Sequence, residues 1–419
     1  MIARKYYLHF SLFLVISCCT ATGGKEEHSD KGASLPEENF QIAEKHYTNM
    51  LKQIDDPTQV PRTTDKHGNL KTTGIEAWTS GFFAGSLWYL YEFTDNDLWK
   101  REATKWTQAL APVQFITSNH DVGFMINCSF GNGLRLAENE AYKAVLIQAA
   151  ESLITRYNAN VGSIESWNYR KAWDGETEWF FPVIIDNMMN LELLFVATKL
   201  SGNPKYKEIA IKHAETTMKN HYRPDFSSYH VVDYDTISGA VLDKATCQGY
   251  TDESAWARGQ AWGLYGFTVV FRETKDPKFL DFAQHIADYI VSYPTMPADK
   301  IPLWDFNALD ADHHPEWEVD KSLYSLKERD VSAAAIIASA LYELSTFSNV
   351  KGVTYKTFAD KIIESLSSPG YRAQVGQNNN FILTQSVGSI PHKVEISVPL
   401  NYADYYFLEG LLRKKNLEL

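Results

Sequence analysis

Two aspartates stand where their carboxyl groups could act as acids or bases. Asp121 lies in HDVGFM and Asp186 lies in FFPVIIDN, each in an apolar frame at the predicted start of a helix. An aspartate in front of a helix commonly caps backbone N–H groups, and capping is one interpretation of both residues. Apolar surroundings also raise the pKa of a carboxyl group towards the value that a general acid needs. Because paired carboxyl groups are typical of glycoside cleavage, that chemistry is the second interpretation.

Tryptophans in polar loops extend this interpretation to sugar binding. The chain has 11 Trp, and a flat aromatic ring offers a surface on which a pyranose can stack. Trp88, Trp99 and Trp106 follow helical periodicity, so we assign them to the core. For Trp78 and Trp262, core packing and sugar stacking remain equally open.

The segment TCQGYTDESAWARGQAWGLYGF combines polar side chains with two tryptophans. A helix that began at Asp252 would place Asp252, Trp256 and Gln260 on one face. It would place Arg258 and Trp262 together on another. A guanidinium beside a tryptophan can bind both oxygens of a carboxylate, so Arg258 is a candidate carboxylate clamp. A surface salt bridge is the simpler alternative for Arg258.

The charge balance and the motifs exclude several classes of function. Of 419 residues, 40 are Lys+Arg and 52 are Asp+Glu, so the net charge is −12. This acidic chain offers no basic field for a phosphate backbone, which argues against nucleic-acid binding. His313 and His314 lie in an acidic loop without a Cys partner, so we expect no metal site. The sequence also has no phosphate-binding glycine motif.

Helical hairpins must position these loops. From about residue 35 onward, an apolar helix, a short turn and a second helix that opens on an aromatic recur. The turns are YEFTDNDLW, LAENEAY, TKLSGNPKY and RETKDPKF, with a looser copy in ELSTFSNVKGVTY. Each turn places Gly, Asn, Asp or Pro where one helix ends and the next begins. The loops that join the hairpins vary in length, and such loops usually carry function.

With an N-terminal helix near residues 37–51 and a C-terminal one near 402–413, the hairpins give about twelve helices. This count predicts an all-α fold, an (α/α)6 barrel built from six helical hairpins. An open solenoid would need regular repeats and polar caps, which the sequence lacks. Since no linker interrupts the hairpins, we expect residues 35–419 to form one catalytic domain.

The N-terminus resembles a bacterial lipoprotein signal. Arg4 and Lys5 precede about a dozen largely apolar residues, so we interpret residues 1–17 as a signal peptide. The tetrapeptide VISC makes Cys18 the expected lipidation site, and residues 18–34 are expected to form a flexible tether. The predicted location is the periplasm, the outer membrane or the cell surface, with no membrane contact besides this anchor. A secreted protein in which Cys18 has no role is the alternative.

Six blocks of the sequence resemble glycoside hydrolase family 88, the unsaturated glucuronyl hydrolases. The blocks are WTSGFFAGSLWYLYEFT, HDVGFMINCSFGNGLRL, FPVIIDNMMNLELLF, TDESAWARGQAWGLYGFT, RDVSAAAIIASALYELS and EISVPLNYADYYFLEGLLR, within residues 78–413. The resemblance implies an (α/α)6 barrel without a cofactor. It also implies removal of the 4,5-unsaturated glucuronyl residue that polysaccharide lyases leave at the non-reducing end of oligosaccharides.

The resemblance further implies roles for individual residues. Asp186 would protonate carbon 4 of the unsaturated sugar, and its carboxylate would then activate the water that adds at carbon 5. Asp121 would hold the ring hydroxyls and oppose the developing positive charge. The implied substrate-binding residues are Trp78, His230, Thr246, Gln248, Arg258 and Trp262, with Trp173 or Trp167 stacking on the sugar. Ser386, Ser389 and Lys393 resemble, at a different spacing, residues that hold sulfate in some members.

Two other functions stay open at this point. One is the activity of the related unsaturated rhamnogalacturonyl hydrolases, which act on pectin fragments. The other is a non-catalytic surface lipoprotein that only binds glycans. For the enzyme, the expected partners are unsaturated uronic-acid oligosaccharides released by lyases from a glycosaminoglycan or from ulvan.

Overall fold

The computed structural model describes residues 32–137, 139–172, 174–315, 317–322 and 324–419. Leu35–Leu419 forms one compact unit. The predicted signal peptide, Cys18 and Trp173 lie outside the described residues, so their predictions stay as such. Within the described ranges, no helix combines the length and the apolar character that a membrane span requires.

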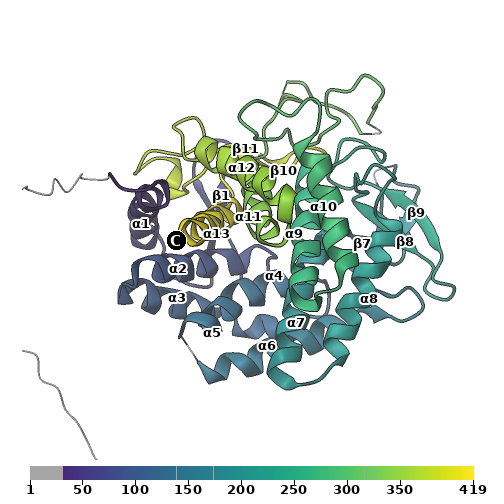
Figure 1. Cartoon of the computed structure of the whole chain (residues 1–419), viewed down its shortest axis with the longest axis horizontal. Coiled ribbons are helices and arrows are strands. Elements are labelled where there is room, and N and C mark those ends of the chain that lie inside the picture. The colour runs from purple at the N-terminus through teal and green to yellow at the C-terminus, as the bar shows by residue number, and fades with distance from the viewer. Residues whose placement is uncertain (1–31, 138, 173, 316, 323) are drawn as a thin grey trace, which may run out of the picture. The chain divides into compact units, whose positions relative to one another are not determined.

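An inner ring of helices forms the centre of this unit (Figure 1). Its members are α2 (Ser80–Thr94), the run of α4 (Val122–Ile126), η2 (Asn127–Gly131) and α5 (Asn132–Ala137), then η3 (Ile185–Asn190) with α7 (Leu191–Ser201), α9 (Ala257–Thr274), α11 (Val331–Phe347) and α13 (Asn401–Glu418). Each contacts the next, and α13 closes the ring against α2. Most of their side chains are buried, as in α11, because the ring packs on both of its sides.

An outer helix follows or precedes each inner one along the chain. The outer helices are α1 (Leu35–Gln53), α3 (Asp97–Ala109), α6 (Glu140–Ile154), α8 (Lys205–Asn220), α10 (Pro277–Val291) and α12 (Asn349–Leu366). Each outer helix buries side chains along one face only. In α3, for example, the buried side chains include Trp99, Ala103 and Trp106, at spacings of four and three. Inner and outer helices therefore alternate, and the predicted (α/α)6 barrel is confirmed.

Short turns connect each inner helix to the next outer helix, as the sequence predicted. After α2, Asp95 takes a left-handed conformation with φ 53°, and the Asn96 side chain accepts a hydrogen bond from Leu98 N. After α7, Gly202 fills the same left-handed position with φ 72°. The aromatic residues that open the outer helices are buried over these turns; they are Trp99, Tyr142, Tyr206, Phe279 and Tyr355.

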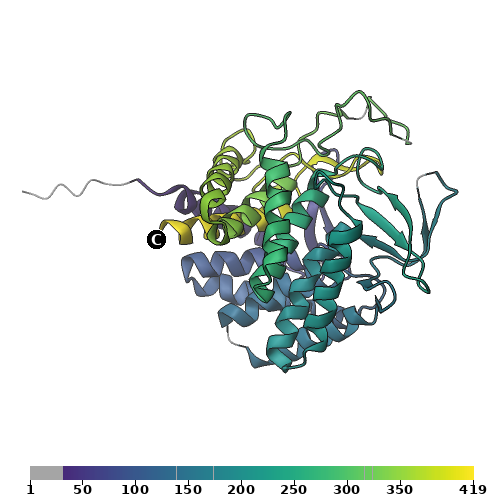
Figure 2. The same cartoon turned by 45° about the vertical axis from the view of Figure 1, so that its right-hand side comes forward.

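Longer connections lead from each outer helix to the next inner one, and they carry short antiparallel strands that the sequence patterns did not indicate. The pairs are β1 (Val60–Thr64) with β2 (Leu70–Thr73), β3 (Tyr157–Asn158) with β4 (Ser163–Ile164), β5 (Arg170–Lys171) with β6 (Glu178–Trp179), and β10 (Ser386–Ser389) with β11 (Val394–Val398). A three-stranded sheet joins β7 (Pro182–Ile184), β8 (Val231–Tyr234) and β9 (Val241–Ala245). Figure 2 shows this sheet beside the helices, with β8 and β9 reaching outward. Two further 3-10 turns, η1 (Ala111–Phe115) and η4 (Asn378–Asn380), complete the loops.

Helix α9 begins later than a start at Asp252 would require. Trp256 is extended, with φ −61° and ψ 123°, and the first helical residue is Ala257. Asp252 lies in the preceding loop, where its carboxylate accepts a hydrogen bond of 2.6 Å from Thr246 N. Asp252 therefore does not share a helix face with Trp256. At the C-terminus, α13 extends to Glu418, five residues beyond the predicted end.

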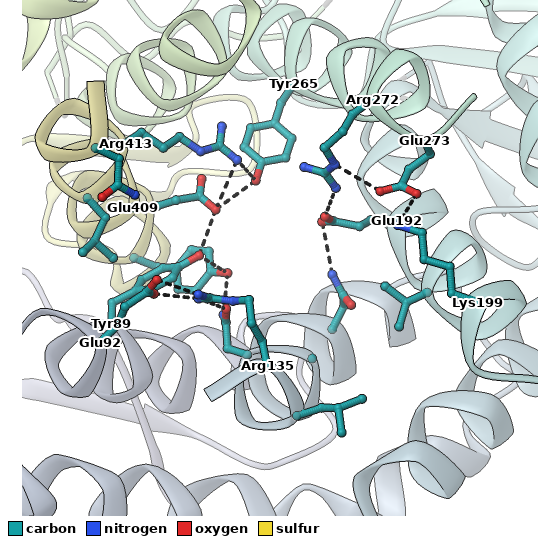
Figure 3. A pocket seen from close by; sticks show the side chains of 18 residues that line it. Tyr89, Glu92, Arg135, Glu192, Lys199, Tyr265, Arg272, Glu273, Glu409 and Arg413 are labelled. Atoms are coloured by element: carbon teal, nitrogen blue, oxygen red, sulfur yellow. Dashed lines mark hydrogen bonds and ion pairs between the residues drawn. The ribbon is translucent and has the colours of Figure 1, made fainter. Parts of the chain in front are cut away.

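The C-terminal ends of the inner helices surround a polar cavity of about 580 Å³ (Figure 3). Arg413, Arg272 and Arg135 point into it, each paired with glutamates, as in the 2.6 Å contact between Arg135 and Glu92. Glu409 accepts hydrogen bonds from Tyr89, Tyr265 and Ser339. Arginine suits this end because the helix dipoles are negative there.

Candidate active site

The predicted catalytic aspartates lie at the opposite end of the ring, where the inner helices begin. Asp121 directly precedes α4, and Asp186 is the second residue of η3. Arg258 and Tyr402 hold the second positions of α9 and α13. Helix N-termini carry partial positive charge, so several of them together favour an anionic ligand.

Asp121 occupies a capping position without capping the helix. Its side chain makes no cap hydrogen bond, so the capping interpretation is wrong for this carboxylate. The side chain is 17% exposed, and its Oδ1 atom lies 3.4 Å from Nε2 of His120. The carboxylate is therefore directed towards the site.

The hydrogen bonds around His120 determine where its proton lies. Asn190 Oδ1 accepts a bond from Phe124 N at 2.9 Å, so the Asn190 amide nitrogen must face Nδ1 of His120, 3.3 Å away. Nδ1 then accepts, and the proton lies on Nε2, facing Asp121. Burial lowers the pKa of His120 to about 3, so the ring is neutral. Gly123 lets Asn190 pack this closely, because a Cβ atom there would collide with the Asn190 side chain.

Asp186 has a similar partner on the other side of the site. It also makes no cap hydrogen bond, so capping is wrong here as well. Its side chain is 12% exposed, and its Oδ2 atom lies 3.7 Å from Nε2 of His230. His230 Nδ1 accepts hydrogen bonds from the backbone N–H groups of Cys247 and Gln248, at 3.0 and 3.1 Å. Since burial lowers the pKa of His230 well below its usual value, the neutral ring carries its proton on Nε2.

Both carboxyl groups hold their protons more strongly than an exposed aspartate. Burial raises the pKa of Asp121 to about 8, with a further contribution from the charge of Asp186. Burial raises the pKa of Asp186 to about 7, against the opposing charge of Arg258. Because the two groups interact, they titrate as a pair. Near neutral pH, the pair can donate a proton and still carry negative charge.

A cavity of about 250 Å³ opens at this end of the ring. The residues that line it are Arg62, Trp78, Trp167, Arg170, Cys247, Gln248, Arg258, Gly388, Ser389, His392, Val394, Glu395 and Tyr402. Trp78, Gln248 and Arg258 were predicted to bind substrate. The fold brings Trp78, which lies just before α2, next to Gln248 in the loop before α9 and Arg258 in α9 itself. Trp167, one of the two candidates for stacking, also lines the cavity.

Other predicted residues lie around the cavity rather than in its lining. Trp262 is fully buried, and its indole N–H favours the ionised form of Asp186. The Thr246 hydroxyl accepts a hydrogen bond from Gly249 N at 2.8 Å, within its own turn. Ser386 is fully buried in β10, whereas Lys393 is exposed. Of the three predicted sulfate-binding residues, the structure brings only Ser389 to the cavity.

Arg258 is a buried side chain, so a surface salt bridge is the wrong description of it. Its Nη1 atom lies 2.9 Å from Oδ2 of Asp330, and both side chains are at most 1% exposed. The guanidinium also donates to the carbonyl groups of Val387 and Gly388. These contacts tie β10 to α9 and α11, and they place a fixed positive charge next to Asp186.

Several residues of this site were not predicted from the sequence. His120 directly precedes Asp121, and a histidine next to a candidate acid was a signal that could have found it. His392 lies between the predicted Ser389 and Lys393, so it could also have been found. No local pattern in the sequence points to Arg170 or Tyr402, because only the packing of segments that are distant in sequence brings them to the cavity.

Comparisons with known proteins show the family of the chain. A family model described as Glycosyl Hydrolase Family 88 matches residues 42–406. The chain is 46% identical over 343 residues to the unsaturated glucuronyl hydrolase of Formosa agariphila, covering 82% of this chain and 81% of that protein. It is 30% identical to the unsaturated chondroitin disaccharide hydrolase of Streptococcus agalactiae, covering 80% and 81%. The crystal structure of an unsaturated glucuronyl hydrolase specific for heparin aligns with TM-score 0.84 and 44% identity, covering 92% and 98%.

Proposed function

The chain belongs to glycoside hydrolase family 88 and is an unsaturated glucuronyl hydrolase, and we propose that Asp186 and Asp121 catalyse its reaction on glycosaminoglycan-derived disaccharides. The observation that carries the assignment is a pair of buried carboxyl groups whose pKa values burial raises. Asp121 and Asp186 come from different loops, meet at one end of the barrel, and each faces the N–H of a neutral histidine. Buried acids with raised pKa values are suited to proton transfer near neutral pH.

The reaction that we propose is hydration of the vinyl ether in the unsaturated sugar. Asp186 donates its proton to carbon 4, and positive charge develops at carbon 5 with help from the ring oxygen. The negative charge of Asp121 stabilises this positive charge, and its carboxylate holds ring hydroxyl groups. The carboxylate of Asp186 then takes a proton from water as the water oxygen bonds to carbon 5. The resulting hemiketal opens and releases a keto-uronate and the shortened saccharide.

For the parent polysaccharide, the comparisons favour heparin-type fragments over chondroitin-type fragments. Identity to the heparin-specific structure is 44%, and identity to the chondroitin disaccharide hydrolase is 30%. Both relatives act on fragments of anionic polysaccharides, which suits the helix N-termini and Arg258 at the site. Ulvan fragments are the further candidate substrate.

The experiment follows the ultraviolet absorbance of the conjugated unsaturated uronate. The purified protein is mixed in turn with lyase digests of heparin, chondroitin sulfate, ulvan and rhamnogalacturonan. We expect the absorbance to fall fastest with the heparin digest. A response to the rhamnogalacturonan digest alone would overturn the substrate assignment, and no response to any digest would favour a glycan-binding lipoprotein.

We also propose that the protein is exported and lipidated at Cys18. Support comes only from the sequence, in which the basic and apolar N-terminal residues precede VISC. Expression of the full chain with Cys18→Ala tests this proposal by membrane fractionation. The wild type should sediment with membranes and the variant should not, and equal fractionation of both would contradict lipidation.

A further inference from the structure

Four residues that precede helices of this barrel cap them in the usual way. Asn96, Asn139, Asp276 and Asp330 have extended backbones, and each side chain accepts a hydrogen bond from the backbone N–H two residues later. Asp121 differs, because its backbone is helical, with φ −72° and ψ −3°, and its carboxylate makes no cap hydrogen bond. The N–H groups in the first turn of α4 therefore need another acceptor.

That acceptor is Asn190, which belongs to a different helical element. Asn190 ends η3, directly before α7, and its side chain makes no cap hydrogen bond to that helix. Its Oδ1 atom instead accepts a hydrogen bond of 2.9 Å from the N–H of Phe124, the third residue of α4. A capping side chain normally accepts from the second or third helical residue, so Asn190 makes the bond that Asp121 would otherwise make.

The same amide group also contacts the residue that precedes Asp121. Its nitrogen lies 3.3 Å from Nδ1 of His120, so one side chain holds the chain on both sides of Asp121. Asn190 is fully buried, and it fills space that the absent side chain of Gly123 leaves open. Asp186 lies four residues before Asn190 in η3. The short element that carries one proposed catalytic carboxyl group therefore fixes the segment that carries the other.

We propose that Asn190 is a positioning residue for the reaction: it caps α4 in place of Asp121 and so leaves the Asp121 carboxylate available to substrate. The inference rests on the proposed function, in which Asp121 stabilises positive charge at carbon 5. Without Asn190, the buried N–H of Phe124 would lose its acceptor, which destabilises the folded state. Asp121 could replace that acceptor by taking the extended conformation of a normal cap, and its carboxylate would then leave the site.

The test compares Asn190→Ala with Asn39→Ala. Asn39 is also fully buried and also joins separate elements, since its amide donates to Ser367 at 3.0 Å and accepts from Arg372 at 2.7 Å. It lies in the outer helix α1, outside the site. Both variants should lose stability, so thermal unfolding midpoints are measured together with kcat/KM on the unsaturated disaccharide that the wild type cleaves best.

We expect Asn190→Ala to lower kcat/KM by roughly 10²-fold, the effect of displacing a reacting group by about 1 Å. Asn39→Ala should keep the kcat/KM of the wild type. Gly123→Ala retains both polar side chains but displaces Asn190, so it should lower kcat/KM as well, and it provides the test if Asn190→Ala does not fold. Because alanine favours helix more than glycine does, a lower activity of Gly123→Ala would reflect the displaced Asn190 rather than a weaker helix.

A second measurement combines Asn190→Ala with Asp121→Ala, which removes the side chain that could replace the lost cap. The two changes should couple in opposite directions in activity and in stability. In kcat/KM, Asn190→Ala should have a much smaller effect when Asp121 is already Ala, because the carboxylate that it positions is absent. In thermal unfolding, Asn190→Ala should lower the midpoint more in that background, because Asp121 can no longer accept from the Phe124 N–H.

Three results would overturn the proposal. One is wild-type kcat/KM in Asn190→Ala or in Gly123→Ala, and another is an equal loss of kcat/KM in Asn39→Ala. The third is an unfolding midpoint that Asn190→Ala lowers equally with and without the Asp121 side chain. By contrast, if the wild type cleaved no disaccharide, the proposed function itself would fail, and the unfolding measurements would still test whether Asn190 and Asp121 are coupled.

Discussion

Nε2 of His230 lies 3.7 Å from Oδ2 of Asp186, and the two backbone N–H groups bound at Nδ1 leave the histidine proton on the Asp186 side. In the described structure, both of these facing atoms lack a hydrogen-bond partner. Buried polar atoms without partners are rare in folded proteins, and at an active site they mark where a ligand binds. The pair is therefore arranged to hold a substrate between a neutral N–H donor and a carboxyl group.

Replacement of Asp186 with Asn should abolish turnover while it preserves binding. The amide keeps the shape of the side chain but cannot donate a proton to carbon 4 or take one from water. We expect kcat to fall by about 10²- to 10⁴-fold, as general acid–base precedent indicates. Absorbance loss measures turnover, and calorimetric titration with an unsaturated disaccharide measures binding. Full activity of the variant would contradict the assignment, and lost binding with unchanged kcat would do so as well.

The same change should stabilise the folded protein at high pH. The folded state raises the pKa of Asp186 from its usual value to about 7, so the folded chain binds this proton more strongly than the unfolded chain. The wild type therefore loses stability as pH rises from about 4 through about 7, and Asp186→Asn does not. At pH 8, the unfolding midpoint of the variant should be higher by roughly 1–3 °C, whereas at pH 4 the two should agree. A midpoint that is equal or lower at pH 8 would contradict the raised pKa.

Activity should decline as pH rises above about 7, because the proton that Asp186 donates is then lost. Removal of the nearby Arg258 charge favours the protonated carboxyl, so any residual activity of Arg258→Gln should persist to higher pH. The measurement is kcat/KM against pH for both proteins. If kcat/KM declined at the same pH in the variant as in the wild type, Arg258 would not act on Asp186.

Arg258→Gln should also destabilise the fold through Asp330. It leaves the fully buried Asp330 carboxylate without its cation, and breaking a buried pair in this way costs about 3–5 kcal/mol. Addition of Asp330→Asn should recover part of this loss, because no charge then remains unpaired. The free energy of unfolding by denaturant, measured for both single variants and the double variant, gives a double-mutant cycle. Additive losses would mean that the two side chains are not coupled.

At the other end of the barrel, Glu409→Gln should lower stability without changing catalysis at 25 °C. Glu409 accepts hydrogen bonds of 2.8 and 2.9 Å from Tyr89 and Tyr265. Its charge also lies 3.6 Å from Arg413. We expect a loss of about 1–3 kcal/mol in the free energy of unfolding.

Glu92→Gln is the matched control at this cavity. Glu92 pairs with Arg135, whose side chain is 47% exposed, so solvent screening should limit its loss to about 1 kcal/mol or less. Unfolding by denaturant and the kcat of each folded variant provide the comparison. A larger loss for Glu92→Gln than for Glu409→Gln would contradict the role of burial in this network.

The helical framework could be predicted because its signals are local. The turn at Asp95 and Asn96 needs one residue with positive φ and one capping side chain, and both requirements are visible in YEFTDNDLW. Apolar periodicity likewise separated Trp99 and Trp106, which are buried, from the loops. The short strands were missed because each has only two to five residues, too few to show an alternating pattern. The late start of α9 at Ala257 was missed because Trp256, just before it, pairs with the distant Asp305.

For the site, the sequence alone identified Asp121 and Asp186 as candidate acids, through their apolar flanks and the resemblance to a known family. It could not decide between capping and catalysis, since that depends on which atoms each carboxylate meets after folding. Nor could it show that Arg258 would be paired with Asp330 or that Arg170 would lie over the ring of Trp167. Local chemistry along the chain therefore determined the helices and the candidate residues. Only the tertiary structure determined burial, proton positions and charge pairing, because these depend on contacts between loops that are distant in sequence.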